Sequence, residues 1–245
     1  MSRIGTDPEV FLKGEDFISA ERYFKGTKDK PEVIEPGFTL MSDNVAAEWT
    51  IPPANTADEF VASNVKMMDY IRMHLDYPVD ICIQSSAEFP PEELQTKNSM
   101  TFGCSPDETI FGMPCVPSAK KTSLRSCGGH IHFETKRFDV IRFVVGFEML
   151  VNLPITMKDP DRERRKLYGK CGSFRIKPYG FEFRSVSNYW LTSEDLMVFV
   201  FNQMQKLEDF KMPTIEEVNL LQSAINEYDE NAWDQLVNQR KLELV

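Results

Sequence analysis

Apolar and polar residues along the chain predict short strands interrupted by helices. Residues 8–12 and 17–24 are rich in β-type residues, and a KGED turn separates them, which is typical of a β-hairpin. Residues 25–37 are polar and contain two prolines, so they indicate a loop. The apolar segments 44–50 and 79–84 predict further strands, and short β pieces are also expected near 87–89 and 101–104.

Helical spacing follows the expected strand over residues 44–50. Apolar residues recur every three or four positions after residue 56, and Thr56 and Glu59 fit a capping box. The apolar segment 138–153 predicts a second helix. Two more helices are expected at the C-terminal end, over about 193–209 and from Thr214, where the sequence TIEE repeats the capping pattern.

The order of these elements indicates the fold class. Strands and helices do not alternate regularly, which favours an α+β fold with a largely antiparallel sheet. We find no internal repeat, low-complexity segment or linker, so residues 1–245 are expected to form a single domain. The helices over about 193–240 are interpreted as scaffold. A hydrophobic content of 42% with 18 Phe is enough for a bulky core.

Composition narrows the function. The net charge of −10 disfavours nonspecific nucleic-acid binding. We see no apolar run near the length of a membrane span and no N-terminal secretory signal, so no membrane association is expected. The five cysteines are scattered and never spaced CxxC, which argues against zinc fingers and disulfides and favours a reducing cytoplasm.

One segment runs against the acidic composition. Residues 162–184 hold eight Lys or Arg and two Glu, a local charge of +6. Such side chains pair with phosphate oxygens, and Arg does so with two parallel hydrogen bonds. The segment predicts a binding site for phosphate groups.

Two of the three histidines lie one residue apart in the sequence CGGHIHF, residues 127–133. On a strand, His130 and His132 point to the same face, while the apolar residues between and after them point into a core. Gly128 and Gly129 suggest a bulge or a close approach of the backbone to a ligand. The pair is either a surface feature of an amphipathic strand or part of a metal or phosphate site.

Carboxylates occur in similar strand positions. Asp7 and Glu9 share a face by the same spacing, and Glu48 lies among residues that predict burial, which is costly for an unpaired carboxylate. Glu182 and Arg184 form a further i, i+2 pair, for which an ordinary salt bridge is the simpler interpretation. If these faces converge, the pocket suits Mg²⁺ or Mn²⁺, and the basic segment then implies a nucleoside triphosphate. The sequence has no P-loop and no kinase glycine-rich loop.

Five motifs in this order resemble a known family. GTDPEVF, DNVAAEW, FGCSPDE, CGGHIHF and RRKLYGKCGSFRIKPYGFEFRSVSNYW resemble the phage-type amidoligases, carboxylate–amine ligases of type 2 related to glutamine synthetase and glutamate–cysteine ligase. The resemblance spans about residues 4–191, and the block 164–190 is its most specific part. It implies a glutamine-synthetase-like catalytic fold, a curved sheet with helices packed on one side and with ATP and divalent metals on its concave face.

The resemblance also implies residue roles. Residues 7–9 read DPE, whereas relatives often have ExE at these positions, so the first metal site differs from theirs in one carboxylate. Arg184 resembles the arginine that faces the transferred phosphate, and His132 the histidine that contacts the nucleotide. The expected metal ligands are Asp7, Glu9, Glu48, His130 and Glu182; the expected nucleotide contacts are His132, Arg164, Arg165, Lys170 and Lys177; the expected catalytic residues are Arg184, Glu48 and Arg175.

The chemistry implied has two steps. A substrate carboxylate takes the γ-phosphate of ATP, and an amine then displaces phosphate from the acyl phosphate to give an amide. The loop 103–118 is a candidate lid, and the expected compartment is the cytoplasm, that of the host if a phage encodes the protein. Two alternatives stay open: a metal hydrolase that uses the HIH motif, and a non-catalytic phage protein that retains the fold.

Overall fold

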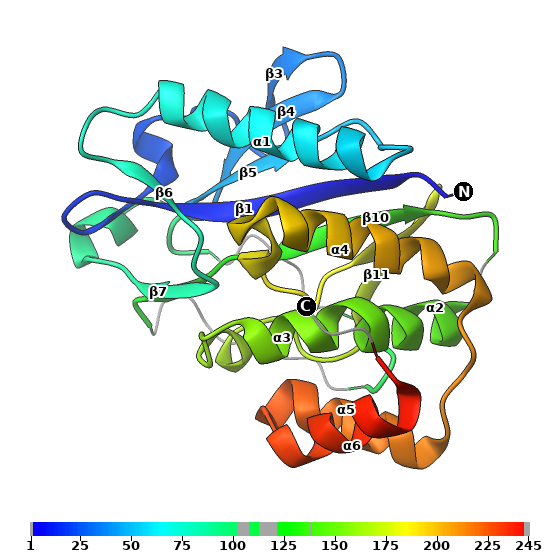
Figure 1. Cartoon of the computed structure of the whole chain (residues 1–245). Coiled ribbons are helices and arrows are strands. Elements are labelled where there is room, and N and C mark those ends of the chain that lie inside the picture. Colours follow the sequence, from blue (N-terminus) through cyan, green and yellow to red (C-terminus); the bar gives the residue numbers. More distant parts are fainter. Residues whose placement is uncertain (1, 102–107, 113–121, 138, 243–245) are drawn as a thin grey trace.

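The computed structural model describes residues 2–101, 108–112, 122–137 and 139–242. Twelve strands occur in this part of the chain, and ten of them form one sheet (Figure 1). The strands are β1 (Ile4–Lys13), β2 (Phe17–Ile18), β3 (Glu32–Glu35), β4 (Phe38–Asp43), β5 (Ala46–Thr50), β6 (Asp80–Cys82), β7 (Ser86–Glu88), β8 (Glu108–Thr109), β9 (Leu124–Ser126), β10 (Gly129–Glu134), β11 (Ser173–Lys177) and β12 (Gly180–Phe183).

Helices cover the sheet and extend below it (Figure 1). The α-helices are α1 (Ala57–Met73), α2 (Val140–Phe147), α3 (Leu153–Lys158), α4 (Glu194–Gln205), α5 (Ile215–Glu227) and α6 (Glu230–Arg240). Shorter helical turns are η1 (Ala20–Arg22), η2 (Pro91–Leu94), η5 (Arg164–Lys166), η6 (Asn188–Thr192) and η7 (Lys206–Asp209), and η4 (Glu148–Asn152) is a π-helical turn that joins α2 to α3.

The main path of the large sheet runs in the order β3-β4-β5-β1-β10-β12-β11-β8, and β2 and β6 both pair with β1. All of these pairs are antiparallel, which confirms the expected type of sheet. The long strand β1 lies near the middle, and a separate two-stranded sheet pairs β7 with β9. The arrangement places four segments that are far apart in sequence, β5, β1, β10 and β12, side by side.

One face of the sheet is apolar and carries the core. Phe181 and Phe183 of β12 meet α2, where the ring of Phe183 stacks on Phe147 with centroids 4.3 Å apart and Phe181 lies 5.4 Å from Phe143. Helices α1 and α4 pack on the same core, with Phe60 against Phe201. Because side chains alternate along a strand, residues 182 and 184 must then point to the opposite face.

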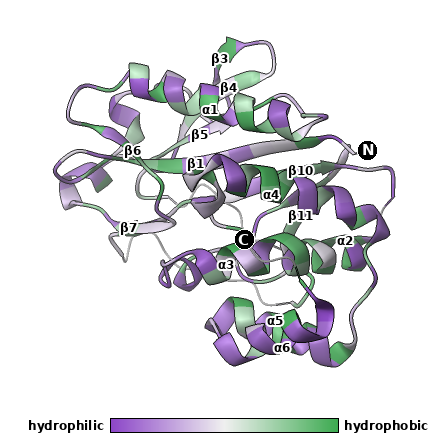
Figure 2. Ribbon diagram, in the orientation of Figure 1, coloured by the Kyte–Doolittle hydropathy of each residue, from purple (hydrophilic) through white to green (hydrophobic). Residues whose placement is uncertain are grey.

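The helical run from α2 through η4 to α3 is strongly apolar, and α2 is mostly hydrophobic in Figure 2. Residues Val140–Lys158 are long and apolar enough to cross a membrane by length and composition, so the expectation that no such stretch exists is wrong in that sense. However, 72% of the segment is buried inside the fold, as in the core helices of soluble proteins.

The predicted elements are mostly present, with different limits. The hairpin β1–β2 is confirmed, and α5 begins with a complete capping box between Thr214 and Glu217. At α1, Thr56 accepts from the Glu59 backbone, but the Glu59 carboxylate accepts from the backbone of Asn55 instead of Thr56. The expected loop 25–37 contains β3, and β4, β9 and α6 were not predicted. Such short elements depend on cross-strand and helix contacts that local patterns do not reveal.

Candidate functional site

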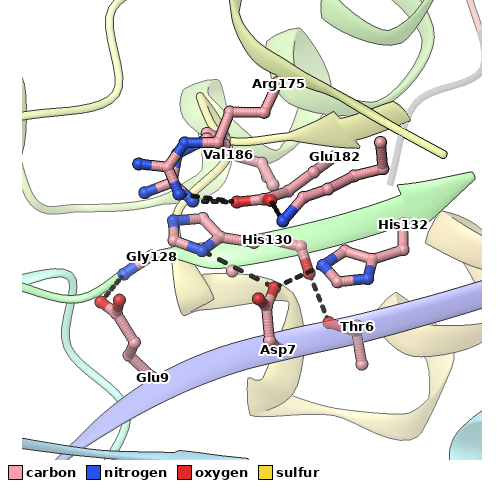
Figure 3. Close-up of polar contacts among 12 residues, drawn as sticks. Thr6, Asp7, Glu9, Gly128, His130, His132, Arg175, Glu182 and Val186 are labelled. Atoms are coloured by element: carbon pink, nitrogen blue, oxygen red, sulfur yellow. Dashed lines mark hydrogen bonds and ion pairs between the residues drawn. The ribbon is translucent and has the colours of Figure 1, made fainter. Parts of the chain in front are cut away.

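The face opposite the core brings the polar strand residues together. In the sheet register Asp7 lies opposite His130, and Glu9 lies opposite Glu48. His132 in turn lies opposite Glu182. Residues directly opposite each other project to the same face. The four strand segments therefore present their acids and imidazoles on one surface, as their spacing predicts. Figure 3 shows the side chains of β1, β10 and β12 in this group.

Asp7 lies between the two histidines (Figure 3). Its Oδ1 is 2.9 Å from Nε2 of His132 and 3.7 Å from Nδ1 of His130. The hydroxyl of Tyr179, in the turn between β11 and β12, lies 2.9 Å from Nδ1 of His132. Both ring nitrogens of His132 thus have protein partners. Burial lowers the pKa of His132, but Asp7 outweighs burial and the net pKa is raised.

His130 has a different environment. Its Nε2 is buried and has no hydrogen-bond partner within the described part of the chain. Burial, and then the charges of Arg184 and Arg164, lower the pKa of His130 well below its usual value. The ring is therefore neutral near pH 7, which is the form that binds metal ions.

Glu182 is surrounded by cations. Its carboxylate pairs with Arg184, which directly follows β12, with Lys177 Nζ at 2.6 Å, and with Arg175 Nη1 at 3.6 Å. Burial alone raises the pKa of this group, but Arg184 and Lys177 outweigh burial and hold the pKa at about 2. Glu182 is therefore a carboxylate under all physiological conditions.

Glu9 shows the opposite shift. Its Oε2 accepts a hydrogen bond of 2.6 Å from the backbone N–H of Gly128. Burial, and then the negative charge of Asp43, nevertheless raise the pKa of Glu9 to about 8. A bound cation would reverse this shift, because it would favour the charged form.

Two groups of potential metal ligands result. Donor atoms of Asp7, His130 and Glu182 lie within 4.8 Å of one another, and so do those of Glu9, Glu48 and Asp43. Oxygen-rich sets with at most one imidazole are the kind that Mg²⁺ and Mn²⁺ prefer. The unpartnered nitrogen of His130 and the raised pKa of Glu9 are both features that a cation would resolve, so the residues fit such an ion.

Sequence reasoning did not single out Asp43. This residue ends β4 and lies opposite Ala46 of β5, beside the pair formed by Met41 and Glu48. Asn44 follows with a left-handed backbone (φ 55°), which closes the tight turn between the two strands. The motif DNVAAEW contained the signal, since a polar turn directly before a buried strand indicates a hairpin that brings Asp43 back toward Glu48.

The glycines before His130 approach protein atoms. A Cβ at Gly128 would lie 2.3 Å from Nε2 of His130, and one at Gly129 would lie 2.2 Å from the carbonyl oxygen of Ser187. Backbone packing therefore requires glycine at position 129, while at position 128 a larger residue would displace the His130 ring. The close approach of this backbone to a ligand stays a prediction.

The basic segment divides into two parts. Arg164 is buried and donates to the carbonyls of Cys127 and Ser185, at 2.9 and 2.7 Å. Arg165 is also buried and donates to Thr156 Oγ1 at 2.5 Å. Their predicted phosphate contacts stay a prediction. In this structure the nitrogens of Arg164 and the two Nη atoms of Arg165 have protein acceptors, whereas Nε of Arg165 has none among the described residues.

The other basic side chains are more accessible. Arg175 and Lys177 are 28% and 32% exposed on the site face of β11, next to Glu182. Lys170 is half-buried in the turn before that strand. The expected lid 103–118 lies mostly outside the described residues.

Residues 117–237 match the family described as Phage phiEco32-like COOH.NH2 ligase-type 2. This match confirms, over that span, the family that the sequence motifs resemble. The matched part includes β10, β11 and β12, and therefore His130, His132, Glu182 and Arg184. Four acidic residues precede the matched part, and the pairing of β1, β4 and β5 in the sheet brings them to the site: Asp7, Glu9, Asp43 and Glu48. No curated protein matches the chain significantly.

Proposed function

We propose that this protein is an ATP-dependent carboxylate–amine ligase that forms an amide bond through an acyl phosphate. The observation that carries the proposal is the pair of carboxylate-rich groups on one sheet face, bordered by Arg175, Lys177 and Arg184. The family description supports the ligation of a carboxyl group to an amino group. An antiparallel sheet with helices on the opposite face is also what a glutamine-synthetase-like catalytic fold requires.

Divalent metal ions fit the two ligand groups. Asp7, His130 and Glu182 would hold one ion, and Glu9, Asp43 and Glu48 would hold a second. When bound, Mg²⁺ or Mn²⁺ supplies positive charge that neutralises the phosphate oxygens of ATP. Bound cations would also relieve the mutual repulsion of Glu9 and Asp43.

The side chains of this chain have distinct tasks in the reaction. A substrate carboxylate oxygen attacks the γ-phosphorus of ATP, the bond to the bridging oxygen breaks, and ADP leaves. In this proposal Arg184 holds negative charge on the transferred group, while Arg175 and Lys177 present charge from the accessible side of β11. An amine then attacks the acyl carbon, inorganic phosphate leaves, and the amine nitrogen loses a proton to give the amide.

His132 and Tyr179 mark the nucleotide side of this arrangement in our proposal. Tyr179 is 39% exposed and lines a cavity of about 820 Å³ together with Ser2 and Arg3, just before β1, and residues 134–137 at and after the end of β10. The size lies within the range of ligand-binding cavities. We place the nucleotide at this end, where His132 connects the cavity to Asp7.

The hydrolase alternative finds some support, because both histidines lie near the same carboxylate. Against it, His132 uses both ring nitrogens for Asp7 and Tyr179, so it offers no nitrogen to a metal in this arrangement. The ligase also gives the basic side chains a role. We further propose a reducing compartment such as the cytoplasm, since Cys82, Cys127 and Cys171 are all free thiols.

The proposal is tested with purified protein, ATP, Mg²⁺ and pools of amino acids and peptides. Hydroxylamine serves as a small amine that traps an acyl phosphate as a hydroxamate. We expect carboxylate-dependent ADP release and hydroxamate formation, both strongly reduced in Arg184→Ala. Zinc-dependent hydrolysis without ATP would favour the hydrolase. Failure to bind Mg²⁺–ATP in calorimetry would favour the non-catalytic alternative.

A further inference from the structure

Tyr168 contacts Arg184 through both its hydroxyl and its ring. The hydroxyl oxygen accepts a hydrogen bond of 2.7 Å from Nε of Arg184 and a second one from Nη2. The guanidinium carbon of Arg184 lies 5.4 Å from the centre of the Tyr168 ring. The same ring lies 6.2 Å from the ring of His130, at an angle of 50°. Tyr168 therefore adjoins a predicted metal ligand and the predicted phosphate-contacting arginine at once.

The segments that carry these two residues are tied together. The backbone N–H of Tyr168 donates to the carbonyl of Arg164, and the guanidinium of Arg164 donates to the carbonyls of Ser185 and Val186, directly after Arg184. Gly169 has φ +75°, and a Cβ there would lie 1.7 Å from Nη1 of Arg164. The backbone around Tyr168 is thus held against the backbone around Arg184, which gives the hydroxyl a defined place.

We propose that Tyr168 is a positioning residue for Arg184. The inference rests on the proposed function, in which Arg184 holds charge on the transferred phosphoryl group. The guanidinium is planar, so bonds from Nε and Nη2 to one oxygen fix the orientation of the plane. Nη1 is then directed at Glu182 in the first ligand group. Without the hydroxyl, the guanidinium gains freedom to rotate and spends less time in the orientation that the transition state needs.

Tyr168→Phe isolates the hydroxyl. The phenyl ring retains the contacts with Arg184 and His130, so the change should leave packing intact. We expect kcat to fall about 10- to 100-fold with KM for ATP within about two-fold of wild type, as misplacement of a catalytic group by about 1 Å does. Tyr70→Phe on α1, whose ring lies 4.3 Å from that of His74 outside the site, is the matched control and should leave both constants unchanged.

Nitrogen-15 NMR of the arginine Nε–H groups provides a readout that does not depend on turnover. We expect the Nε–H signal of Arg184 to shift and to exchange faster with solvent in Tyr168→Phe. The Nε–H of Arg164, which donates to Cys127, is the internal reference and should not change. An unaltered Arg184 signal, or an unaltered kcat in an active enzyme, would overturn the inference. If the wild-type protein shows no ATP-dependent turnover, the proposed function fails, and the NMR signal alone decides whether Tyr168 orients Arg184.

Discussion

Glu9 and Gly128 are joined by two reciprocal hydrogen bonds across neighbouring segments of the sheet. The Gly128 N–H donates to the Glu9 carboxylate at 2.6 Å, and the Glu9 N–H donates to the Gly128 carbonyl at 2.9 Å. The carboxylate is held in place by the backbone, yet its pKa is raised to about 8 by burial and by Asp43. The backbone thus holds this carboxyl group in place, and a cation bound beside it would favour the ionised form that burial disfavours.

This raised pKa predicts that metal binding depends on pH. Below about pH 8 Glu9 holds a proton that a metal ion must displace, so apparent Mn²⁺ affinity should rise up to about tenfold per pH unit as pH approaches 8. Calorimetry in buffers of different ionisation enthalpy should show proton release near pH 7 that declines above pH 9. Glu9→Gln should remove this proton release, and an unchanged release in that variant would contradict the assignment.

The raised pKa of Glu9 also determines how its contribution to the stability of the fold changes with pH. The folded pKa of Glu9 lies above the ordinary value of 4.5, so the folded state binds this proton more tightly than the unfolded state. The contribution of Glu9 is full below pH 4.5 and is lost as pH rises to about 8. Metal-free Glu9→Gln should therefore lose less stability over this range than wild type in urea unfolding, and added Mg²⁺ should reduce the difference between them.

Glu182 should be a major stabilising residue at neutral pH. Its carboxylate is about 1% exposed and pairs with three cations, so Glu182→Gln leaves Arg184 buried without its ion-pair partner. Breaking a buried pair typically costs about 3–5 kcal/mol. Glu134→Gln, which breaks an exposed pair with Arg3, is the control and should have little effect in urea unfolding. Equal effects of both variants would show that Glu182 contributes no more than a surface charge.

Alanine substitutions of His130 and His132 should have different effects on metal binding and on KM for ATP. His130→Ala removes the unpartnered Nε2, so it should weaken Mn²⁺ binding, and high metal concentration should partly restore turnover. His132→Ala removes the link between Asp7 and Tyr179, so it should raise KM for ATP and leave Mn²⁺ affinity nearly unchanged. Separate titrations of metal and ATP distinguish the two. Identical defects would indicate a joint site, as in a zinc hydrolase.

Arg184→Ala should reduce ATP-dependent turnover about 10²- to 10³-fold, the usual cost of one lost charge contact in the transition state. Circular dichroism should show that the fold is retained, because Lys177 and Arg175 still balance Glu182. Arg72→Ala, which removes an exposed arginine of α1 paired with Asp69, is the control and should retain full turnover. Near-normal turnover of Arg184→Ala would contradict its assigned role.

The sequence by itself determined the local side-chain directions. The i, i+2 spacing places His130 with His132 and Glu182 with Arg184 on one face of their strands, because side chains alternate along any extended backbone. The capping pattern at Thr214 and the apolar periodicity of the helices were likewise predictable, since they depend on residues within one or two turns. These features need no knowledge of distant contacts.

Only the tertiary structure decided which of these faces meet and what each polar group contacts. β1 pairs with β10 although more than 110 residues separate them, and Asp43 joins Glu9 and Glu48 through a strand that the sequence pattern did not reveal. Arg164 is directed to backbone carbonyls instead of solvent. Pairing and register follow from burying the apolar face of every strand at once, a condition on the whole chain that no local pattern contains.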